Sequence, residues 1–255
     1  MLSIMSPSKT MDLNCRSCVL QTHPHFISEA RELSSRLKEL SPADLEELMK
    51  ISPRLAALTH KRFQAFSGST VNDVARQALL VYKGDAFQEL DVDRYEDQDF
   101  NFAQKHIRIL SGLYGLLRPL DLIEPHRLEI ATRLSGPWGK NLYEFWTDRI
   151  TQRLNTELEE SDGAPVLVNL ASNEYVKALK RKSLNAARIT IQFKEKKETG
   201  FKVIAIHAKR ARGLLADFII REKIIKPESL KEFTCNGYAF NPELSTSENW
   251  IFSRE

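Results

Sequence analysis

The segment SGLYGLLRPLDLIEPHRLE, from Ser111 to Glu129, contains two glycines, two prolines and two arginines within nineteen residues. It follows FNFAQKHIRIL, in which Ala103, Ile107 and Leu110 recur at helical spacing. This spacing predicts a helix that ends near Gly112. The arrangement of the chain after that glycine determines how we interpret the rest of the sequence.

The two glycines of this segment predict a tight turn between two short helices. Gly112 and Gly115 can adopt positive φ or approach another group closely, and Pro119 can begin a helix because no amide donor is needed there. One interpretation is an αα-corner that turns over a hydrophobic core. The other is a DNA-binding helix-hairpin-helix, whose free backbone amides would face a phosphate beside Arg118. The segment lacks the usual Gly-x-Gly spacing, and its residues alone leave both interpretations open.

The composition is that of a soluble globular protein. The chain has 255 residues, of which 42% are hydrophobic and 28% are charged. No apolar run approaches the roughly 18 residues of a membrane span, and MLSIMSPSKT has no basic region leading into a long apolar stretch. Three cysteines are too few for a disulfide scaffold and are typical of a reducing compartment. We therefore expect a cytoplasmic protein with no membrane partner.

The positive charge is concentrated in one part of the chain. Residues 164–231 contain 16 Lys and Arg against 6 Asp and Glu, whereas the whole chain carries a net charge of only +3. A cationic patch of this kind is typical of a protein with a polyanionic partner. Solvated lysines on helices and strands are the alternative explanation, and they account for most such runs.

The hydrophobic pattern predicts helices in the first two thirds of the chain and strands in the last third. An opening buried strand covers 2–5, and the predicted helices are 27–41, 41–51, 53–66, 71–80, one within 137–160, 177–187 and 210–224. The predicted strands are 166–170, 187–193, 201–207 and two edge strands in the tail, with the hairpin KEKKETG between the second and third. We predict one α/β domain over 1–255, with a mixed sheet and large helical insertions.

Polar clusters follow three of the predicted strands. Ligands bind at the carboxyl ends of strands in open α/β sheets, so the three clusters are predicted to converge on one crevice. Lys209 and Arg212 are three residues apart and share a helix face, an arrangement that suits a phosphate or carboxylate. The candidate residues of the crevice are Lys9, Arg127, Glu129, Asn169, Ser172, Glu174, Tyr175, Lys209 and Arg212.

The chemistry of this crevice is left open by the sequence. One interpretation is a structural ion-pair network in which Glu174 and Glu129 balance the cations. The other is catalysis, in which desolvated Glu174 and Glu129 accept protons and Lys209 is a third candidate group. The chain has no Walker loop, no GxGxxG and no Gly-x-Ser-x-Gly, so no standard reaction class is supported. Cys15, Cys18, His23 and His25 have poor spacing for zinc, and we predict no metal site and no cofactor.

Several segments resemble, in order and spacing, the YaaA family of peroxide-stress resistance proteins. They are SPSKTMDL, YKGDAF, LSGLYGLLRPLDLIEPHRLE, NLASNEY and KRARGLLADFII, and the resemblance runs from Leu2 to about Tyr238. It implies a cytosolic protein that is made under hydrogen peroxide stress, keeps unincorporated iron low and limits damage to DNA and proteins. It also implies a compact α/β fold with a positively charged cleft and a helix-hairpin-helix that binds double-stranded DNA.

The resemblance assigns these features to particular residues. The helix-hairpin-helix would be the region from Gly112 to Arg118, and Lys9, Arg127, Lys209 and Arg212 would line the cleft. Double-stranded DNA, bound with little base readout, is then the expected partner. The alternative is an enzyme that acts on a small anionic or nucleotide-like substrate in the strand-end crevice, since sequence-independent DNA binding does not require Glu129, Asn169 and Glu174.

Overall fold

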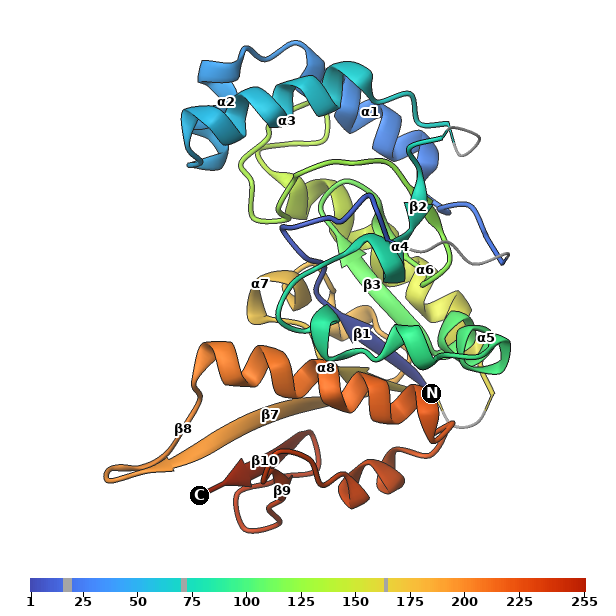
Figure 1. Cartoon of the computed structure of the whole chain (residues 1–255), viewed down its shortest axis with the longest axis vertical. Helices are drawn as coiled ribbons and strands as arrows, with labels where there is room; N and C mark the ends of the chain where they lie inside the picture. Colours follow the sequence, from blue (N-terminus) through green and yellow to red (C-terminus); the bar gives the residue numbers. More distant parts are fainter. Residues whose placement is uncertain (16–19, 70–72, 163–164) are drawn as a thin grey trace.

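The computed structural model describes residues 1–15, 20–69, 73–162 and 165–255. Within them, eight strands form one mixed sheet in the order β4-β3-β1-β6-β7-β10-β9, with β8 paired to β7. The strands β3, β1, β6, β7 and β10 are parallel, whereas β4, β8 and β9 are antiparallel to their neighbours. This is the predicted α/β fold with a mixed sheet (Figure 1).

The strands follow the hydrophobic pattern of the sequence. β1 (Leu2–Met5) is buried throughout and β6 (Val166–Asn169) nearly so, because both lie inside the parallel part of the sheet. β7 (Ala187–Lys197) alternates between buried and half-buried residues and is longer than predicted. β10 (Asn249–Arg254) lies between β7 and β9 (Ala239–Phe240). Of the two edge strands predicted in the tail, only β9 therefore lies at the edge of the sheet.

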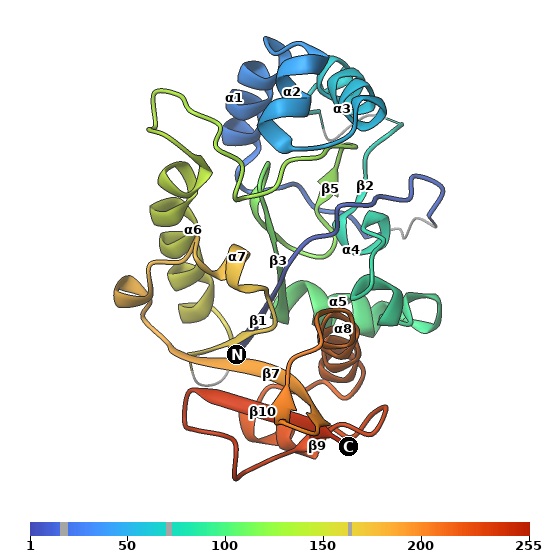
Figure 2. The same ribbon diagram turned by 90° about the vertical axis from the view of Figure 1, so that its left-hand side faces the viewer.

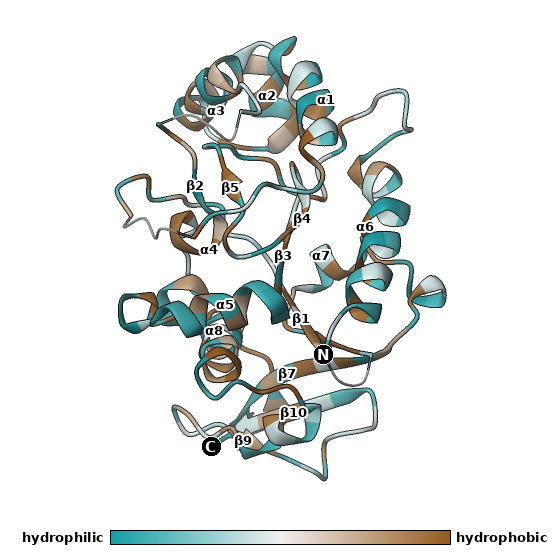
Figure 3. Cartoon of the chain, turned by 90° about the vertical axis from the view of Figure 1, so that its right-hand side faces the viewer, coloured by the Kyte–Doolittle hydropathy of each residue, from teal (hydrophilic) through white to brown (hydrophobic). Residues whose placement is uncertain are grey.

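Helices cover both faces of the sheet (Figure 2). α5 (Asp97–His106) and α8 (Ala205–Arg221) lie together on one side, and α6 (Leu142–Glu159) lies on the other with the short α7 (Asn173–Val176). The predicted helix within 137–160 is therefore confirmed as α6. It carries both hydrophobic and hydrophilic residues, whereas β1 and β3 are mainly hydrophobic (Figure 3).

A helical insertion lies beyond one end of the sheet (Figure 1). It consists of α1 (Ile27–Lys38), α2 (Pro42–Met49) and α3 (Pro53–Ala65), close to the predicted helices. The side chain of Ser41 accepts a hydrogen bond from the Asp44 amide, and the Asp44 carboxylate accepts one from the Ser41 amide. This capping box fixes the start of α2.

Short elements complete the described chain. A small second sheet pairs β2 (Arg76–Gln77) with β5 (Leu122–Ile123). The other short helices are α4 (Ala78–Val81), η1 (Phe87–Glu89), η2 (Val92–Arg94), η3 (Arg181–Ser183) and η4 (Pro227–Glu232). None of the helices in the described ranges is long and apolar enough to cross a membrane.

The prediction of a helix-hairpin-helix around Gly112 was wrong. The segment forms a β-hairpin. The helix α5 ends at His106, and the chain continues as β3 (Ile107–Ser111), a turn and β4 (Gly115–Leu117). Ile107 and Ile109 are β-branched and fully buried in β3, which favours a strand over the continued helix that their spacing suggested. Gly115 has a φ of +67°, so the turn does use the conformational freedom of glycine.

Two predictions in the basic part of the chain were also wrong. The segment 201–207 is divided between β8 (Gly200–Lys202) and the start of α8, because a short apolar run fits a strand and a helix equally well. The segment 177–187 contains η3 and irregular chain instead of a helix. The hairpin between β7 and β8 is confirmed.

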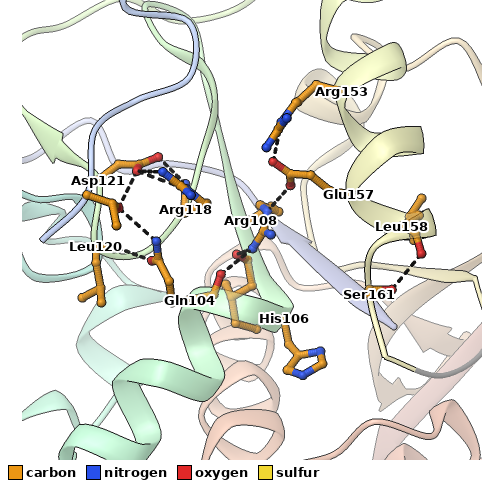
Figure 4. Close-up of polar contacts among 12 residues, drawn as sticks. Gln104, His106, Arg108, Arg118, Leu120, Asp121, Arg153, Glu157, Leu158 and Ser161 are labelled. Atoms are coloured by element: carbon orange, nitrogen blue, oxygen red, sulfur yellow. Dashed lines mark hydrogen bonds and ion pairs between the residues drawn. The ribbon is translucent and has the colours of Figure 1, made fainter. Parts of the chain in front are cut away.

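A buried ion pair joins β3 to α6 (Figure 4). The Nε of Arg108 donates to the Glu157 carboxylate, and its Nη1 donates to the backbone oxygens of Gln104 and Ile107. Arg153 contacts the second oxygen of Glu157 at 2.7 Å. The guanidinium of Arg108 is thus satisfied within the core, where the cost of burying a charge is otherwise high.

Candidate functional site

A cavity of about 790 Å³ lies at the carboxyl ends of three adjacent parallel strands. β1, β3 and the chain after β6 reach it with Met5, Ser111 and Leu170. This is the position at which open α/β sheets bind ligands, and the volume lies in the range of small-molecule sites. Charged side chains surround it: Lys9, Lys83, Asp85, Arg127, Glu129, Glu174, Lys209 and Arg212. We call this space the cleft.

The loop after β1 forms one wall of the cleft and is held by the segment around Lys83. The Ser8 hydroxyl donates to the Lys83 carbonyl at 2.9 Å, and the Lys83 amide donates to the Thr10 carbonyl at 2.9 Å. A Cβ at Gly84 would lie 2.5 Å from Ser8 Oγ, so this contact requires a glycine. Lys9 and Lys83 are thereby fixed on neighbouring segments.

Glu129 binds two of the cations. Its Oε2 lies 2.6 Å from Lys9 Nζ, and its Oε1 accepts a hydrogen bond from Arg127 Nη2 at 3.0 Å. Arg127 Nη1 also donates to the Lys9 carbonyl at 3.4 Å, whereas its buried Nε has no partner in the described chain. One carboxylate therefore serves two positive charges, and a donor of Arg127 remains available.

The helix α8 supplies the two cations of the opposite wall. Lys209 Nζ lies 3.9 Å from the Asp85 carboxylate, at the long end of the ion-pair range. Arg212 has no ion pair or hydrogen bond with the described residues, and its Nε is buried without a partner. Burial lowers the pKa of Arg212. A Cβ at Gly213 would lie 2.0 Å from the Ala86 oxygen, so glycine lets α8 approach this wall.

The floor of the cleft is formed by buried aromatic and imidazole groups. His126 Nδ1 contacts the Glu124 carbonyl at 2.8 Å, which suits a proton on Nδ1 and leaves Nε2 to accept from the Tyr82 hydroxyl at 3.5 Å. Burial lowers the pKa of His126 to about 4, so the ring is neutral near pH 7. Burial also raises the pKa of Tyr82 and Tyr175, which keeps both phenols protonated.

The chain after β6 contributes Ser172 and Glu174. Ser6 Oγ accepts from the Ser172 amide at 2.9 Å and lies 3.3 Å from Ser172 Oγ, which joins the ends of β1 and β6. Glu174 lies in the first turn of α7, and its carboxylate has no hydrogen bond or ion pair with the described residues. It is therefore a carboxylate in a cationic cleft that remains available to a ligand.

Most of the predicted crevice residues lie together in the cleft. Lys9, Arg127, Glu129, Ser172, Glu174, Tyr175, Lys209 and Arg212 all line it, although they come from four separate parts of the chain. Asn169 does not line it. This residue is buried, and its Oδ1 accepts from the Ala171 amide at 2.9 Å, so Asn169 shapes the turn after β6.

Gly112, Gly115 and Arg118 also lie outside the cleft lining. The Arg118 guanidinium donates to Asp121 Oδ1 at 3.0 Å and to the His23 carbonyl at 3.1 Å, so its donors hold the surrounding loops together. Trp146 Nε1 donates to the Gly112 carbonyl at 2.8 Å and packs against Gly115. These three residues were expected to contact phosphate, but in the structure they contact other parts of the protein.

The sequence analysis missed the wall formed by Tyr82, Lys83 and Asp85 and the floor residue His126. The available signal was the segment YKGDAF, which we used only as part of the family resemblance. His126 lies between Pro125 and Arg127, where nothing in the residue types marks it as buried. Its role depends on packing against Tyr82 and Tyr114, which are far from it in sequence.

The cysteine and histidine cluster near the N-terminus lies partly outside the described residues, because Cys18 falls in the range 16–19. In the ranges that the structure describes, no three His, Cys, Asp or Glu side chains are grouped so that they could hold a metal ion.

Together, the fold and the cleft define a mixed α/β protein with a cationic site at the carboxyl ends of its parallel strands. A family model described as peroxide stress protein YaaA matches residues 1–244. The chain is 48% identical over 254 residues to a UPF0246 protein of Acaryochloris marina, with 100% of both chains covered. It is 43% identical over 256 residues to a UPF0246 protein of Cellvibrio japonicus, covering 100% of this chain and 99% of the relative. The chain belongs to the peroxide stress protein YaaA family, which supports a role in oxidative stress.

Proposed function

We propose that the protein acts in the cytoplasm during peroxide stress by binding double-stranded DNA at the mouth of the cleft. The observation that carries this proposal is the convergence of exposed cations around one cavity. The side chains of Lys9, Lys83 and Lys209 are 64%, 53% and 61% exposed, so all three can reach a phosphate outside the cavity. Binding of this kind positions a duplex without reading its sequence.

The absence of a helix-hairpin-helix at Gly112 changes this proposal from the one based on sequence. Phosphate contacts are now assigned to lysine side chains around the cleft, because Arg118 and the two glycines have structural partners. Lysine is a flexible point charge and gives little base specificity. The complex should therefore depend strongly on salt and weakly on sequence.

A salt titration tests DNA binding directly. Three phosphate contacts predict a loss of affinity of about 40-fold between about 50 and 200 mM salt. Fluorescence anisotropy with two duplexes of unrelated sequence should give the same loss for both. The double variant Lys9→Gln, Lys209→Gln should bind more weakly and show a smaller salt slope. The matched control is Lys61→Gln, which removes an exposed charge on α3 outside the cleft. Undetectable binding, or binding that is insensitive to salt, would contradict the proposal.

We further propose that this stress role includes keeping unincorporated iron low, as the family resemblance implies. Iron that is not held by proteins reacts with peroxide and damages DNA. A lower iron concentration and a protein bound to DNA would therefore both protect DNA. The test is a deletion strain complemented with the wild-type gene or the Lys9→Gln, Lys209→Gln variant. Electron paramagnetic resonance of whole cells under peroxide should show lower unincorporated iron only with wild type. Equal iron in the deletion and wild-type strains would contradict this part.

An enzyme that acts on a small anionic or nucleotide-like substrate is the second candidate. The cleft volume of about 790 Å³ favours it, as does the Glu174 carboxylate, which has no partner among the described residues. Glu174, Glu129 and Lys209 would then be the candidate catalytic groups. A metabolite screen by thermal shift, followed by product analysis with wild type and Glu174→Gln, tests this function. Turnover that Glu174→Gln abolishes would support it, and unchanged turnover in that variant would contradict the role of Glu174.

A further inference from the structure

Arg212 differs from the other cations of the cleft. Lys9 and Arg127 share Glu129, Lys83 lies 2.7 Å from Asp12, and Lys209 lies 3.9 Å from Asp85. Arg212 has no such partner in the described chain, although its Nε is buried. A partly buried guanidinium without an acceptor costs free energy. The site is therefore built to receive an anion at Arg212.

The charge balance of the cleft indicates how many negative charges that anion carries. Glu129 serves both Lys9 and Arg127, so one positive charge is left over in that group. Arg212 adds a second. A phosphomonoester carries about −1.5 to −2 charges near pH 7, whereas a phosphodiester within a nucleic acid strand carries one. Glu174 lines the same cleft and offsets one of these two charges, so the charge balance admits either ligand, and the two free buried donors, Arg127 Nε and Arg212 Nε, direct the anion to these two residues.

The shape of the cleft distinguishes between the two ligands and favours the end of a molecule. Its lining includes the buried side chains of Met5, Tyr82, Ser111 and His126, so the cleft reaches into the core. A volume of about 790 Å³ suits a ligand of nucleotide size and is too small for a duplex. Glu174, whose carboxylate has no partner in the described chain, can accept hydrogen bonds from the amino group of a base and, in a free nucleotide, from sugar hydroxyls.

We propose that the interior of the cleft binds the terminal phosphomonoester of a nucleotide, with Arg212 and Arg127 on the phosphate and Glu174 facing the nucleoside. The proposal rests on the proposed function where the nucleotide is the end of a broken DNA strand, because the mouth lysines then hold the adjoining duplex. A free nucleoside monophosphate has the same chemistry. The test therefore includes both sources.

The experiment uses one DNA hairpin with a 5′-phosphate, a 3′-phosphate or two hydroxyl ends. At equal salt, at least one phosphorylated form should bind wild type about tenfold more tightly than the hydroxyl form. Arg212→Gln should bind the phosphorylated and hydroxyl forms with equal affinity, and Lys61→Gln should retain the preference of wild type. Thermal unfolding checks that each variant folds. If Arg212→Gln does not fold, Arg212→Lys keeps the charge but not the two-pronged geometry and should show an intermediate preference.

The possible results separate this inference from the proposed function. Equal affinity for all three hairpins, with strong salt dependence, would overturn the inference and leave DNA binding intact. Binding of adenosine 5′-monophosphate that requires Arg212, without binding of any hairpin, would support the phosphomonoester site and overturn DNA binding. A preference for phosphorylated ends that survives Arg212→Gln would overturn the assignment to Arg212.

Discussion

Glu157 shows how much of the fold depends on a single side chain. Its two carboxylate oxygens accept from Arg108 and Arg153, and it joins α6 to the buried strand β3. The side chains of Arg108 and Glu157 are only 7% and 5% exposed. In such a site the charge of one partner is compensated mainly by the other, because water does not reach it.

We predict that Glu157→Gln lowers the free energy of unfolding by about 3 kcal/mol, because the Arg108 cation then stays buried without its counter-ion. Urea denaturation at neutral pH measures this change. The control is Glu159→Gln, which removes an exposed carboxylate from the same helix and should be close to neutral. Equal effects of the two variants would show that the ion pair does not stabilise the fold.

Gly112 leads to a prediction that separates the β-hairpin from the helical turn we first expected. A Cβ at this position would lie 2.2 Å from the Leu128 carbonyl oxygen. Gly112→Ala should therefore cost about 1–3 kcal/mol of folding free energy through this overlap. The control is Asn236→Gly, which introduces a glycine where the φ is already +50°. Glycine adopts this φ without strain, so this variant should not be destabilised. Urea denaturation should show destabilisation only for Gly112→Ala.

At the level of residues, the sequence predicted the charged groups of the cleft better than its floor. Lys9 and Glu174 were found because polar residues after buried strands mark the carboxyl edge of a sheet. Tyr82 and His126 were not found, because a buried tyrosine or histidine has the same local signal as any core residue. Asn169 was expected in the cleft, but its side chain accepts a hydrogen bond from the Ala171 amide within its own loop.

Among the elements, the end of β7 forms a second charged cluster away from the cleft. The buried Glu195 carboxylate accepts hydrogen bonds from Arg254 on β10, from His207 on α8 and from Tyr238. Burial alone would raise the pKa of Glu195, but these bonds and one from Lys197 outweigh burial and lower the pKa to about 2. One carboxylate thus fastens β10 and α8 to β7.

This cluster predicts a specific dependence of stability on pH. The folded-state pKa of Glu195 lies below its ordinary value of 4.5, so its contribution is complete above pH 4.5 and is lost as the pH falls toward 2. Between about pH 6 and about pH 3, wild type should lose more unfolding free energy than Glu195→Gln. Urea denaturation at both pH values measures this difference. Glu198→Gln, at the exposed end of the same hairpin, should behave like wild type.

The elements themselves were predicted where the sequence pattern was long and regular. α1, α2, α3 and α6 follow from apolar spacing, α2 also from its start at Ser41, and β1 and β6 from continuous apolar runs. Errors occurred where the run was short. Residues 107–110 fit a helix by spacing but form β3, because the neighbouring strand β1 supplies backbone partners for their amides and carbonyls. Such long-range pairing has no local sequence signal.

The whole molecule has one continuous hydrophobic core among the described residues, extending from the helical insertion to the C-terminal strands. We therefore predict that the chain unfolds in a single transition. Far-ultraviolet circular dichroism and tryptophan fluorescence should give coincident urea curves, since Trp146 and Trp250 report from different regions. Two separate transitions would show that the domain prediction of one unit over 1–255 is wrong.

The cations of the cleft come from parts of the chain that are far apart, from Lys9 after the first strand to Arg212 in α8. During synthesis, a ribosome must extend the chain past Arg212 before all of these groups can meet. Until then the nascent chain offers only scattered lysines and arginines to the ribosomal RNA around it. The order of the sequence thus delays the assembly of the cationic cleft until α8 has been synthesised.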